Sequence, residues 1–377
     1  MALRTLAGDV KAMRSMGFDA APIAADIEAL PMDDWKARGP LDKGRRMGRT
    51  LCARARFEAP DLLRAIEDER PDVLLVDILT WGALSGAEAW GGPWACFSPP
   101  FLSFASGTGP GAERSQRPQA GLADRSRDWL TQAVRRAGFD RLARPAMNKL
   151  RANLDLPSYR HADEMFMAPP LLLYMTAEPF ELPRPDWPES IVMVGPCAWE
   201  PPGELPAQLA RVQAPLVLVT TSTEFQDDDR LVHTALEALA GEPFHAVATM
   251  PASNTGGLTV PENATVLPFV PHEPILDRAV CAITHGGMGV TQKALARGVP
   301  VCIVPFGRDQ PQVARRVEVT GVGTRLPVQG LRPDQLRAKV HEAIACRAGA
   351  ERIAGAFAAA GGARAAADAF EQRLLGT

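Results

Sequence analysis

One stretch of the sequence restricts the fold more than any other. Residues 281–310 read CAITHGGMGVTQKALARGVPVCIVPFGRDQ. An apolar run ends at His285, a glycine-rich turn and a segment with helical spacing follow, and a second apolar run leads to Asp309. Strands and helices that alternate over short turns are typical of a parallel sheet with helices on its faces. We therefore predict a doubly wound α/β fold.

The same alternation occurs on both sides of a proline-rich segment. Apolar runs with strand character precede this segment at 2–7, 73–78, 93–98 and 171–176, and follow it at 216–221, 244–249, 264–269, 281–284 and 300–306. Repeated proline cannot continue a regular element and suits a connection between domains. We predict two Rossmann-like domains facing a cleft. The expected divisions are an N-terminal domain 1–182 with a helical insertion near 110–168, a linker 183–206, a C-terminal domain 207–350 and a helical tail 351–377.

The composition excludes several classes of protein. The 377 residues are 46% hydrophobic and 23% charged, with a net charge of -3 and a pI near 6.1, which argues against a nucleic-acid partner. No apolar run reaches the length of a membrane span and the N-terminus does not resemble a signal peptide, so we expect a cytoplasmic protein without a membrane partner. Six scattered cysteines indicate buried thiols, not a metal site or disulfide framework: Cys52, Cys96, Cys197, Cys281, Cys302 and Cys346.

The glycine-rich turn after the strand at 281–284 predicts an anion site. In an open parallel sheet, the helix after a strand presents unpaired backbone N–H groups and a positive dipole end at the carboxyl edge. Gly286, Gly287 and Gly289 let a ligand approach the backbone, and His285 can donate a hydrogen bond to a phosphate oxygen. A tight turn with a capping histidine is the simpler alternative. Neither a dinucleotide fingerprint nor a phosphate-binding loop with Gly-Lys-Ser/Thr occurs, and the absence of G-x-S-x-G disfavours an acyl hydrolase.

The motifs resemble those of one enzyme family. THGGMGVTQKALARGVPVCIVPFGRDQPQVARRVE at 284–318, FVPHEPIL at 269–276 and AEPFELPRPDWP at 177–188 are similar to the UDP-glycosyltransferase superfamily with the GT-B fold. The resemblance is closest to bacterial natural-product glycosyltransferases, which act on antibiotics and other aglycones. It implies a nucleotide-sugar donor in the C-terminal domain, a small apolar acceptor in the cleft, no metal and no separate cofactor. A monomer or a homodimer is expected.

The resemblance assigns donor roles position by position. It places the donor diphosphate against the glycine turn and against hydroxyls after the first C-terminal strand. It places the nucleobase after the strand at 264–269 and the sugar at the end of the strand at 300–306. Backbone capping is the alternative role of the hydroxyls. The residues concerned are His285, Gly286, Gly287, Gly289, Val290, Ser222 and Thr223 for the diphosphate; Phe269, Val270 and His272 for the nucleobase; and Asp309 and Gln310 for the sugar. Phe269 could instead belong to the core, and Asp309 could also cap a helix.

Two positions depart from the family pattern. Related enzymes often have Ser where this chain has Val290, and many have a ribose-binding Glu where it has Lys293. An ammonium group cannot accept the hydrogen bonds of ribose hydroxyls. We therefore expect a dTDP-sugar donor, whose deoxyribose lacks the 2′-hydroxyl. The alternative is that Lys293 points to solvent.

The N-terminal domain is expected to contribute the acceptor site. In the family, a strand, a Gly-His loop and a helix come first, and the loop His is the general base. Here residues 2–7 resemble the second strand, which leaves neighbouring strands with unpaired edges. Asp77 matches the residue that orients the base, and a polar strand end is the alternative role. Aromatic side chains are expected to line the acceptor cleft, or to belong to the core: Trp81, Phe97, Phe101 and Phe104.

The overall prediction is an inverting glycosyltransferase that moves a sugar from a dTDP- or UDP-sugar to a hydroxyl of an apolar natural product. Because the first histidine after Met1 is His161, the base is missing from the expected place. A start site placed too late, a truncated fragment and a nucleotide-sugar-binding protein without activity are the alternatives that this leaves open. A nucleotide-sugar epimerase is a further alternative with the same overall fold.

Overall fold

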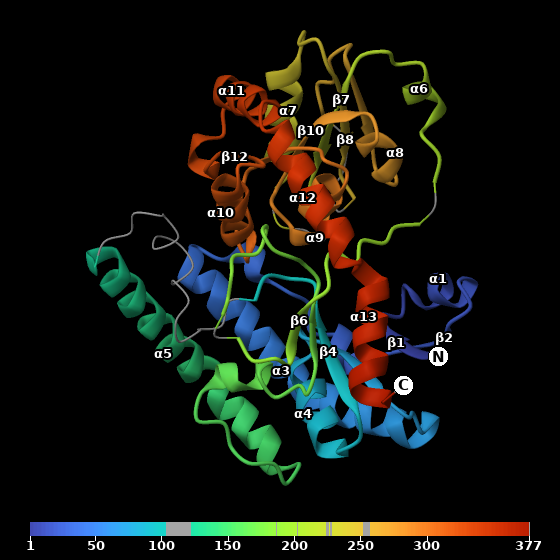
Figure 1. The fold of residues 1–377 in the computed structure, drawn as a ribbon, viewed down its shortest axis with the longest axis vertical. Coiled ribbons are helices and arrows are strands. Elements are labelled where there is room, and N and C mark those ends of the chain that lie inside the picture. The colour runs from blue at the N-terminus through green and yellow to red at the C-terminus, as the bar shows by residue number, and fades with distance from the viewer. Residues whose placement is uncertain are drawn as a thin grey trace.

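The structure is a computed structural model of the chain. It describes residues 1–102, 122–185, 187–201, 203–223, 226, 228–251 and 257–376. Figure 1 shows two lobes, with the N-terminal residues in the lower lobe and most of the C-terminal residues in the upper one.

The lower lobe is built on two parallel sheets. A four-stranded sheet has the order β3-β4-β5-β6, and a separate two-stranded sheet pairs β1 with β2. The strands are β1 (Ala2–Thr5), β2 (Asp19–Pro22), β3 (Leu74–Asp77), β4 (Trp94–Ser98), β5 (Leu172–Tyr174) and β6 (Ile191–Met193). β3 lies at a sheet edge and Leu75 in it is 52% exposed, which agrees with the expectation of unpaired strand edges in this half.

The lower lobe also contains several helices, two of which are long. The helical elements of the lower lobe are α1 (Val10–Ser15), α2 (Ala25–Glu28), η1 (Asp34–Lys36), α3 (Pro40–Glu69), α4 (Trp81–Trp90), α5 (Leu122–Ala152) and η2 (Ala162–Phe166). The backbones of α3 and α4 are in direct contact at Gly82 of α4. A Cβ atom there would lie 2.0 Å from the carbonyl oxygen of Ala55 on α3. The Gly82 N–H donates a hydrogen bond to Glu58 on α3 at 2.8 Å. Glu58 thus satisfies a free N–H in the first turn of α4.

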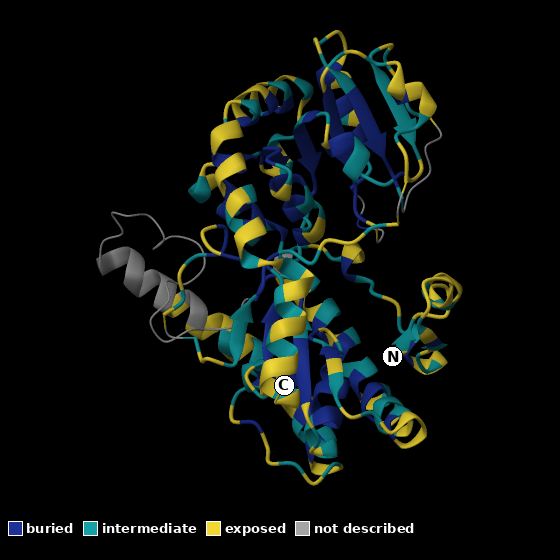
Figure 2. Ribbon diagram, turned by 45° about the vertical axis from the view of Figure 1, so that its right-hand side comes forward, coloured by how far each residue is buried: buried dark blue, intermediate teal, exposed yellow. Residues whose placement is uncertain are grey.

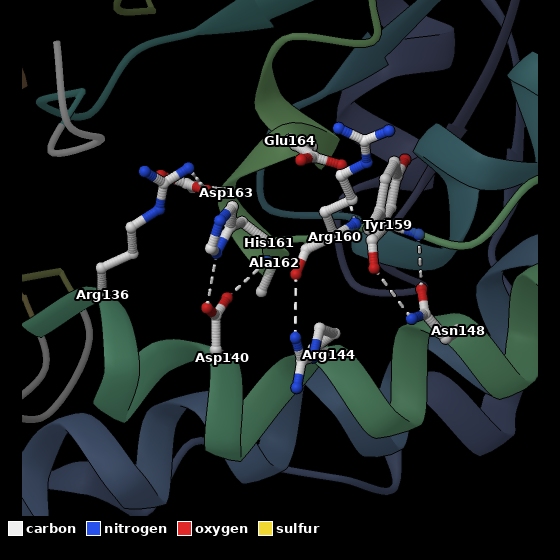
Figure 3. A network of polar contacts seen from close by, with 10 residues as sticks. All are labelled: Arg136, Asp140, Arg144, Asn148, Tyr159, Arg160, His161, Ala162, Asp163 and Glu164. Atoms are coloured by element: carbon white, nitrogen blue, oxygen red, sulfur yellow. Dashed lines mark hydrogen bonds and ion pairs between the residues drawn. The ribbon is translucent and has the colours of Figure 1, made fainter. Parts of the chain in front are cut away.

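One face of α5 holds the loop that follows it (Figure 3). Asp140, Arg144 and Asn148 are spaced four residues apart and therefore share a helix face. Asn148 exchanges two hydrogen bonds with the Tyr159 backbone, and Arg144 donates to the Arg160 carbonyl. Asp140 accepts the Ala162 N–H at 2.7 Å and contacts His161 Nδ1 at 2.8 Å. The first histidine of the chain therefore takes part in anchoring this loop.

The upper lobe contains a six-stranded parallel sheet with the order β12-β11-β10-β7-β8-β9. Its strands are β7 (Leu216–Thr220), β8 (His245–Thr249), β9 (Ala264–Leu267), β10 (Ala279–Thr284), β11 (Val301–Ile303) and β12 (Gly323–Arg325). Its helical elements are α6 (Ala207–Ala210), α7 (Arg230–Leu239), α8 (Glu273–Leu276), α9 (Met288–Ala296), α10 (Gln310–Thr320), η3 (Val328–Gly330) and α11 (Pro333–Ile344). The central strands are buried on both faces (Figure 2), as parallel sheets require.

The C-terminal tail connects the two lobes. α12 (Arg347–Ala360) packs on the upper sheet, with Ile353 and Phe357 in its core. Gly361 adopts φ +89° and ends α12, after which α13 (Gly362–Phe370) and a last turn η4 (Glu371–Leu375) return to the lower lobe (Figure 1). Alanines of α13 pack against Leu171 and Leu173 in the lower core. The predicted tail 351–377 is helical, with a break at Gly361.

A buried ion pair also joins the lobes. After β5 the chain places Phe180 in the upper core and buries Glu181 completely. Glu181 contacts Arg316 of α10 at 2.6 and 3.2 Å, and the Tyr174 hydroxyl donates to it at 2.8 Å. The Arg316 guanidinium in turn lies 3.9 Å from the ring centroid of Phe101. Residues from both lobes therefore meet in one buried cluster.

Candidate functional site

The candidate site lies at the carboxyl edge of the upper sheet, where it faces the lower lobe. β7, β10 and β11 are neighbours in this sheet. Because they are parallel, the segments that follow them meet at one edge. These segments carry Ser222, His285 and Asp309, respectively. The structure thus brings together three of the predicted groups of residues that are far apart in the sequence.

Close packing requires two of the three glycines after β10, Gly286 and Gly287. Gly286 adopts φ +92°, and a Cβ atom there would lie 2.6 Å from Ile303 Cγ2. A Cβ atom at Gly287, the N-cap residue of α9, would lie 2.5 Å from His285 Nε2. Gly289 has no atom within 4 Å of its Cβ position, so it leaves the surface of the first helical turn open. The turn therefore exposes backbone N–H groups at the positive end of α9.

His285 is a neutral imidazole in this structure. Burial lowers the pKa of His285 to about 4, although a hydrogen bond with the Thr220 backbone favours the charged form. The charge of Arg308 lowers the pKa further. Among the described residues, its Nδ1 has no hydrogen-bond partner although the side chain is 7% exposed. A buried nitrogen without a partner is costly unless a ligand completes the site.

A hydrogen-bonded chain of polar groups connects the loops after β7 and β11. The Ser222 N–H donates to Asp228 at 2.7 Å, and Ser222 Oγ accepts from Gln226 at 2.7 Å. Gln226 accepts from the Gln310 amide at 2.8 Å. Ser222 is thus buried in a fixed orientation, whereas Thr223 is exposed.

Gln310 also organises the loop that precedes it. Its Oε1 accepts the N–H groups of Phe306 and Gly307 at 2.7 and 2.9 Å. With one amide N–H on Gln226, the second N–H remains as its donor for a ligand. Asp309 accepts the N–H of Phe101 at 3.2 Å, and burial raises the pKa of Asp309. The predicted sugar-binding pair therefore has a structural role as well.

The three residues predicted for the nucleobase have different environments. Phe269 is 59% exposed beyond the end of β9, which excludes the alternative that it is a core residue. Val270 is buried in the upper core. His272 is 3.0 Å from Thr249 Oγ1, and burial lowers the pKa of His272 to about 4. Phe269 is accordingly the one of the three with a free aromatic face for a base.

Lys293 does not point to solvent, so that alternative is wrong. Its Nζ lies 3.2 Å from Glu200, and the two side chains are 19% and 8% exposed. Glu200 also accepts the N–H groups of His272 and Glu273 at 2.9 and 2.7 Å. A carboxylate from the segment that joins the lobes thus lies beside α9, where Lys293 neutralises it.

The residues expected in the acceptor cleft are mostly buried. Trp81 is 4% exposed and packs edge-on against Phe139 at 5.6 Å, so it belongs to the lower core. Phe97 on β4 is partly buried. Phe101 is 6% exposed beneath Arg316, and Phe104 lies outside the described residues. Core packing, the alternative that the sequence left open, therefore holds for Trp81.

Asp77 ends β3 as a partly buried carboxylate. It accepts the Leu79 N–H at 2.8 Å, and its own carbonyl oxygen accepts from Thr80 Oγ1 at 2.6 Å. Burial raises the pKa of Asp77. The local bonds explain Asp77 as the start of the turn into α4 and leave its second carboxylate oxygen without a hydrogen bond in the described structure.

Sequence reasoning missed the contacts that the lower lobe makes with this site. Arg308, beside Asp309, forms a two-point ion pair with the fully buried Asp34 at 2.9 and 3.0 Å. Lys43 Nζ donates to the Phe306 carbonyl at 3.3 Å. Asp34 and Lys43 lie more than 260 residues from these partners along the chain, and no local motif marks them.

The described residues contain neither a candidate metal site nor a candidate membrane span. No group of three or more His, Cys, Asp or Glu side chains within the described ranges could hold a metal ion. None of the helices in those ranges is both long and apolar enough to cross a membrane.

The arrangement of two lobes is that of the GT-B glycosyltransferases. The glycosyltransferase of kitacinnamycin superimposes with a TM-score of 0.75 at 24% identity, over 99% of this chain and 91% of that one. The glycosyltransferase VinC, solved in complex with dTDP, has a TM-score of 0.73 at 20% identity, over 100% and 92% of the two chains. The predicted GT-B fold is confirmed.

Sequence comparisons identify the family. Residues 234–368 match the model of the erythromycin biosynthesis protein CIII-like C-terminal domain. The 4′-demethylrebeccamycin synthase of Lentzea aerocolonigenes is 30% identical over 294 residues, which cover 75% of this chain and 69% of that protein. The chain belongs to the natural-product glycosyltransferases found in antibiotic pathways.

Proposed function

We propose that this protein transfers a sugar, with inversion, from a nucleoside diphosphate to a hydroxyl group of a small, largely apolar natural product. The observation that carries the proposal is the convergence of His285, Ser222 and Asp309 at one sheet edge next to the first turn of α9. The first turn of α9 offers backbone N–H groups, Gln310 keeps one amide N–H, and Asp309 offers a carboxylate. That is the chemistry needed by a diphosphate and a sugar.

The proposed donor site has three parts. The diphosphate lies against the N–H groups of α9 and beside His285, with Ser222 and Thr223 opposite. The negative charge of the diphosphate favours the protonated imidazole, in which Nδ1 of His285 is a donor as well. The nucleobase stacks on the exposed ring of Phe269, bordered by Val270 and His272. The sugar hydroxyls bind the Asp309 carboxylate and the second N–H of Gln310. As the bond to the sugar breaks, negative charge grows on the diphosphate, and donors already fixed in place stabilise it.

The acceptor binds from the lower lobe. Phe101 lies beside Asp309, so the segment after β4 connects the acceptor side to the donor sugar. We propose that Asp77 occupies the position of the residue that orients the general base, a histidine that this sequence does not have at the expected place. None of the reported relatives is named an epimerase, and no contact among the described residues favours that alternative.

We further propose that dTDP-sugars are preferred to UDP-sugars. Lys293 and Glu200 form a closed pair where related enzymes have a ribose-binding glutamate. Glu200 already accepts three donors, so it is poorly available for a 2′-hydroxyl. The reported complex of VinC with dTDP supports this choice of nucleotide.

A transfer assay tests the function. The chain is incubated with dTDP-glucose or UDP-glucose and a set of aromatic aglycones, and the products are separated by chromatography and mass spectrometry. We expect a glycosylated product of inverted anomeric configuration, formed faster from the dTDP-sugar. Tighter binding of UDP than of dTDP in calorimetric titration would contradict the nucleotide preference. Donor turnover without a glycoside in any reaction would contradict the transferase assignment.

A further inference from the structure

The strongest unassigned feature is a cation that the lower lobe places on the loop of the upper one. Lys43, in the first turn of α3, is partly buried and reaches the loop at 306–309. Its side chain lies flat on Gly307, since a Cβ atom there would lie 2.5 Å from Lys43 Nζ and 2.7 Å from its Cδ. The absence of a side chain at position 307 is therefore what lets Lys43 lie there.

The ammonium of Lys43 is incompletely paired. It has three N–H donors, and its hydrogen bond within the described residues is the one to the Phe306 carbonyl at 3.3 Å. It forms no ion pair within 4.0 Å in the described part of the chain. Both carboxylate oxygens of the nearby Asp34 accept hydrogen bonds from Arg308 Nε and Nη2. Burial lowers the pKa of Lys43, and the negative charges of Asp34 and Asp228 offset this only in part.

The position of Lys43 connects it to the phosphate turn through two residues. Lys43 binds the carbonyl of Phe306, whose N–H donates to Gln310 Oε1. Gln310 Cβ lies 3.3 Å from the Cβ position of Gly286. Lys43 is also close enough to Arg308 and Asp228 for their charges to change its pKa, and Arg308 acts in the same way on His285. Lys43 thus contacts the loop that leads from β11 to Asp309, and Gln310 at the end of this loop packs against the glycine turn after β10.

We propose that Lys43 is a donor-binding residue, which the lower lobe contributes to neutralise the distal phosphate of the nucleotide-sugar, the one bonded to the sugar. This inference rests on the proposed function. It means that the donor site is complete when both lobes are in contact, because one of its cations comes from α3. The ion pair between Asp34 and Arg308 holds the same loop, so Lys43 is not needed merely to join the lobes.

Nucleotide titrations test this role. Lys43→Met is compared with Lys36→Met, which removes an exposed lysine in η1 that lies over the Trp35 ring. Affinities for dTDP and dTMP are measured by calorimetry, with thermal melts as a check of folding. We expect Lys43→Met to weaken dTDP binding about 10-fold or more, the usual effect of losing a charged hydrogen bond. Binding of dTMP should change by less than about 2-fold, and Lys36→Met should behave as the wild type.

Two further variants separate charge from packing. Lys43→Arg should restore most of the dTDP affinity, because it keeps a cation on the loop. Gly307→Ala should reproduce the loss by displacing the Lys43 side chain, and the double variant with Lys43→Met should bind no more weakly than the weaker single variant.

The outcomes distinguish this inference from the proposed function. If the wild type binds neither dTDP nor UDP, the proposed function fails and the inference fails with it. If the wild type binds dTDP and Lys43→Met binds it equally well, the inference alone is overturned. Equal weakening of dTDP and dTMP would also overturn it, because Lys43 would then act on the site as a whole and not on the distal phosphate.

Discussion

The buried pair of Arg316 and Glu181 allows a quantitative prediction, because both side chains have no solvent exposure. Removing one member of a buried ion pair leaves an unpaired charge and costs about 3–5 kcal/mol. In the variant Arg316→Met, Glu181 would keep its hydrogen bonds from Tyr174 and the Leu182 N–H, and Arg184 lies 3.9 Å away. These contacts place the expected loss at the low end, about 3 kcal/mol of unfolding free energy.

The assay is urea unfolding, followed by circular dichroism and by tryptophan fluorescence. All seven tryptophans precede residue 200, so fluorescence reports the lower lobe, whereas circular dichroism reports both. The double variant Arg316→Met with Glu181→Gln should be more stable than Arg316→Met alone, because it removes the unpaired charge. The control, Arg347→Met, breaks an exposed pair with Glu351 and should cost less than about 0.5 kcal/mol. A loss below about 1 kcal/mol for Arg316→Met would refute the reasoning, because water would then be reaching the pair.

Three other perturbations have defined outcomes. Burial raises the pKa of Glu58 to about 7, so its ionisation destabilises the native state as the pH rises from about 4.5 to 7. Glu58→Gln should therefore be more stable than the wild type by up to about 3 kcal/mol at pH 8 and equally stable near pH 4. Urea unfolding that gives the same difference at both pH values would contradict this. Gly82→Ala should lower the melting temperature strongly, because its Cβ would overlap the Ala55 carbonyl oxygen. The control Gly138→Ala lies in α5 with no atom within 4 Å of its Cβ, and it should raise stability by about 0.5–1 kcal/mol. Similar melts for the two variants would contradict the close contact of α3 and α4. Gly286→Ala should reduce dTDP affinity by about 10-fold or more, because φ +92° and the contact with Ile303 both oppose a side chain; unchanged affinity in a titration would show that the turn is not part of the site.

Periodicity and turn residues predicted the fold well because they act locally. The apolar runs at 216–221 and 244–249 each contain an observed strand, and the run at 281–284 lies within β10 (Ala279–Thr284). The strand expected at 300–306 is shorter, Val301–Ile303, because the backbone of Phe306 and Gly307 is bound by Gln310. A side chain that captures backbone N–H groups ends a strand in a way that apolar pattern does not reveal.

The residues of the candidate site that lie in one sequence motif could be predicted. The contacts between the two lobes at this site could not. His285 and its glycines are specified by a turn between adjacent elements, so sequence is enough. The partners of Arg308 and Lys293 come from distant segments, Asp34 and Glu200, and their pairing depends on how the lobes pack. Trp81 could not be assigned from sequence, since an aromatic residue after a strand suits both a cleft and a core. Its contacts with Phe139 and Phe166 decide for the core.

The central claim is that a nucleoside diphosphate binds at the turn after β10, and one comparison tests it most directly. The wild type and His285→Ala are titrated with dTDP in a calorimeter, with thermal melts recorded for both. The account predicts that the wild type binds and that His285→Ala binds at least about 10-fold more weakly, with an unchanged melt, because a buried donor to the phosphate is lost. Equal binding by the two proteins, or no binding by a folded wild type, would contradict it.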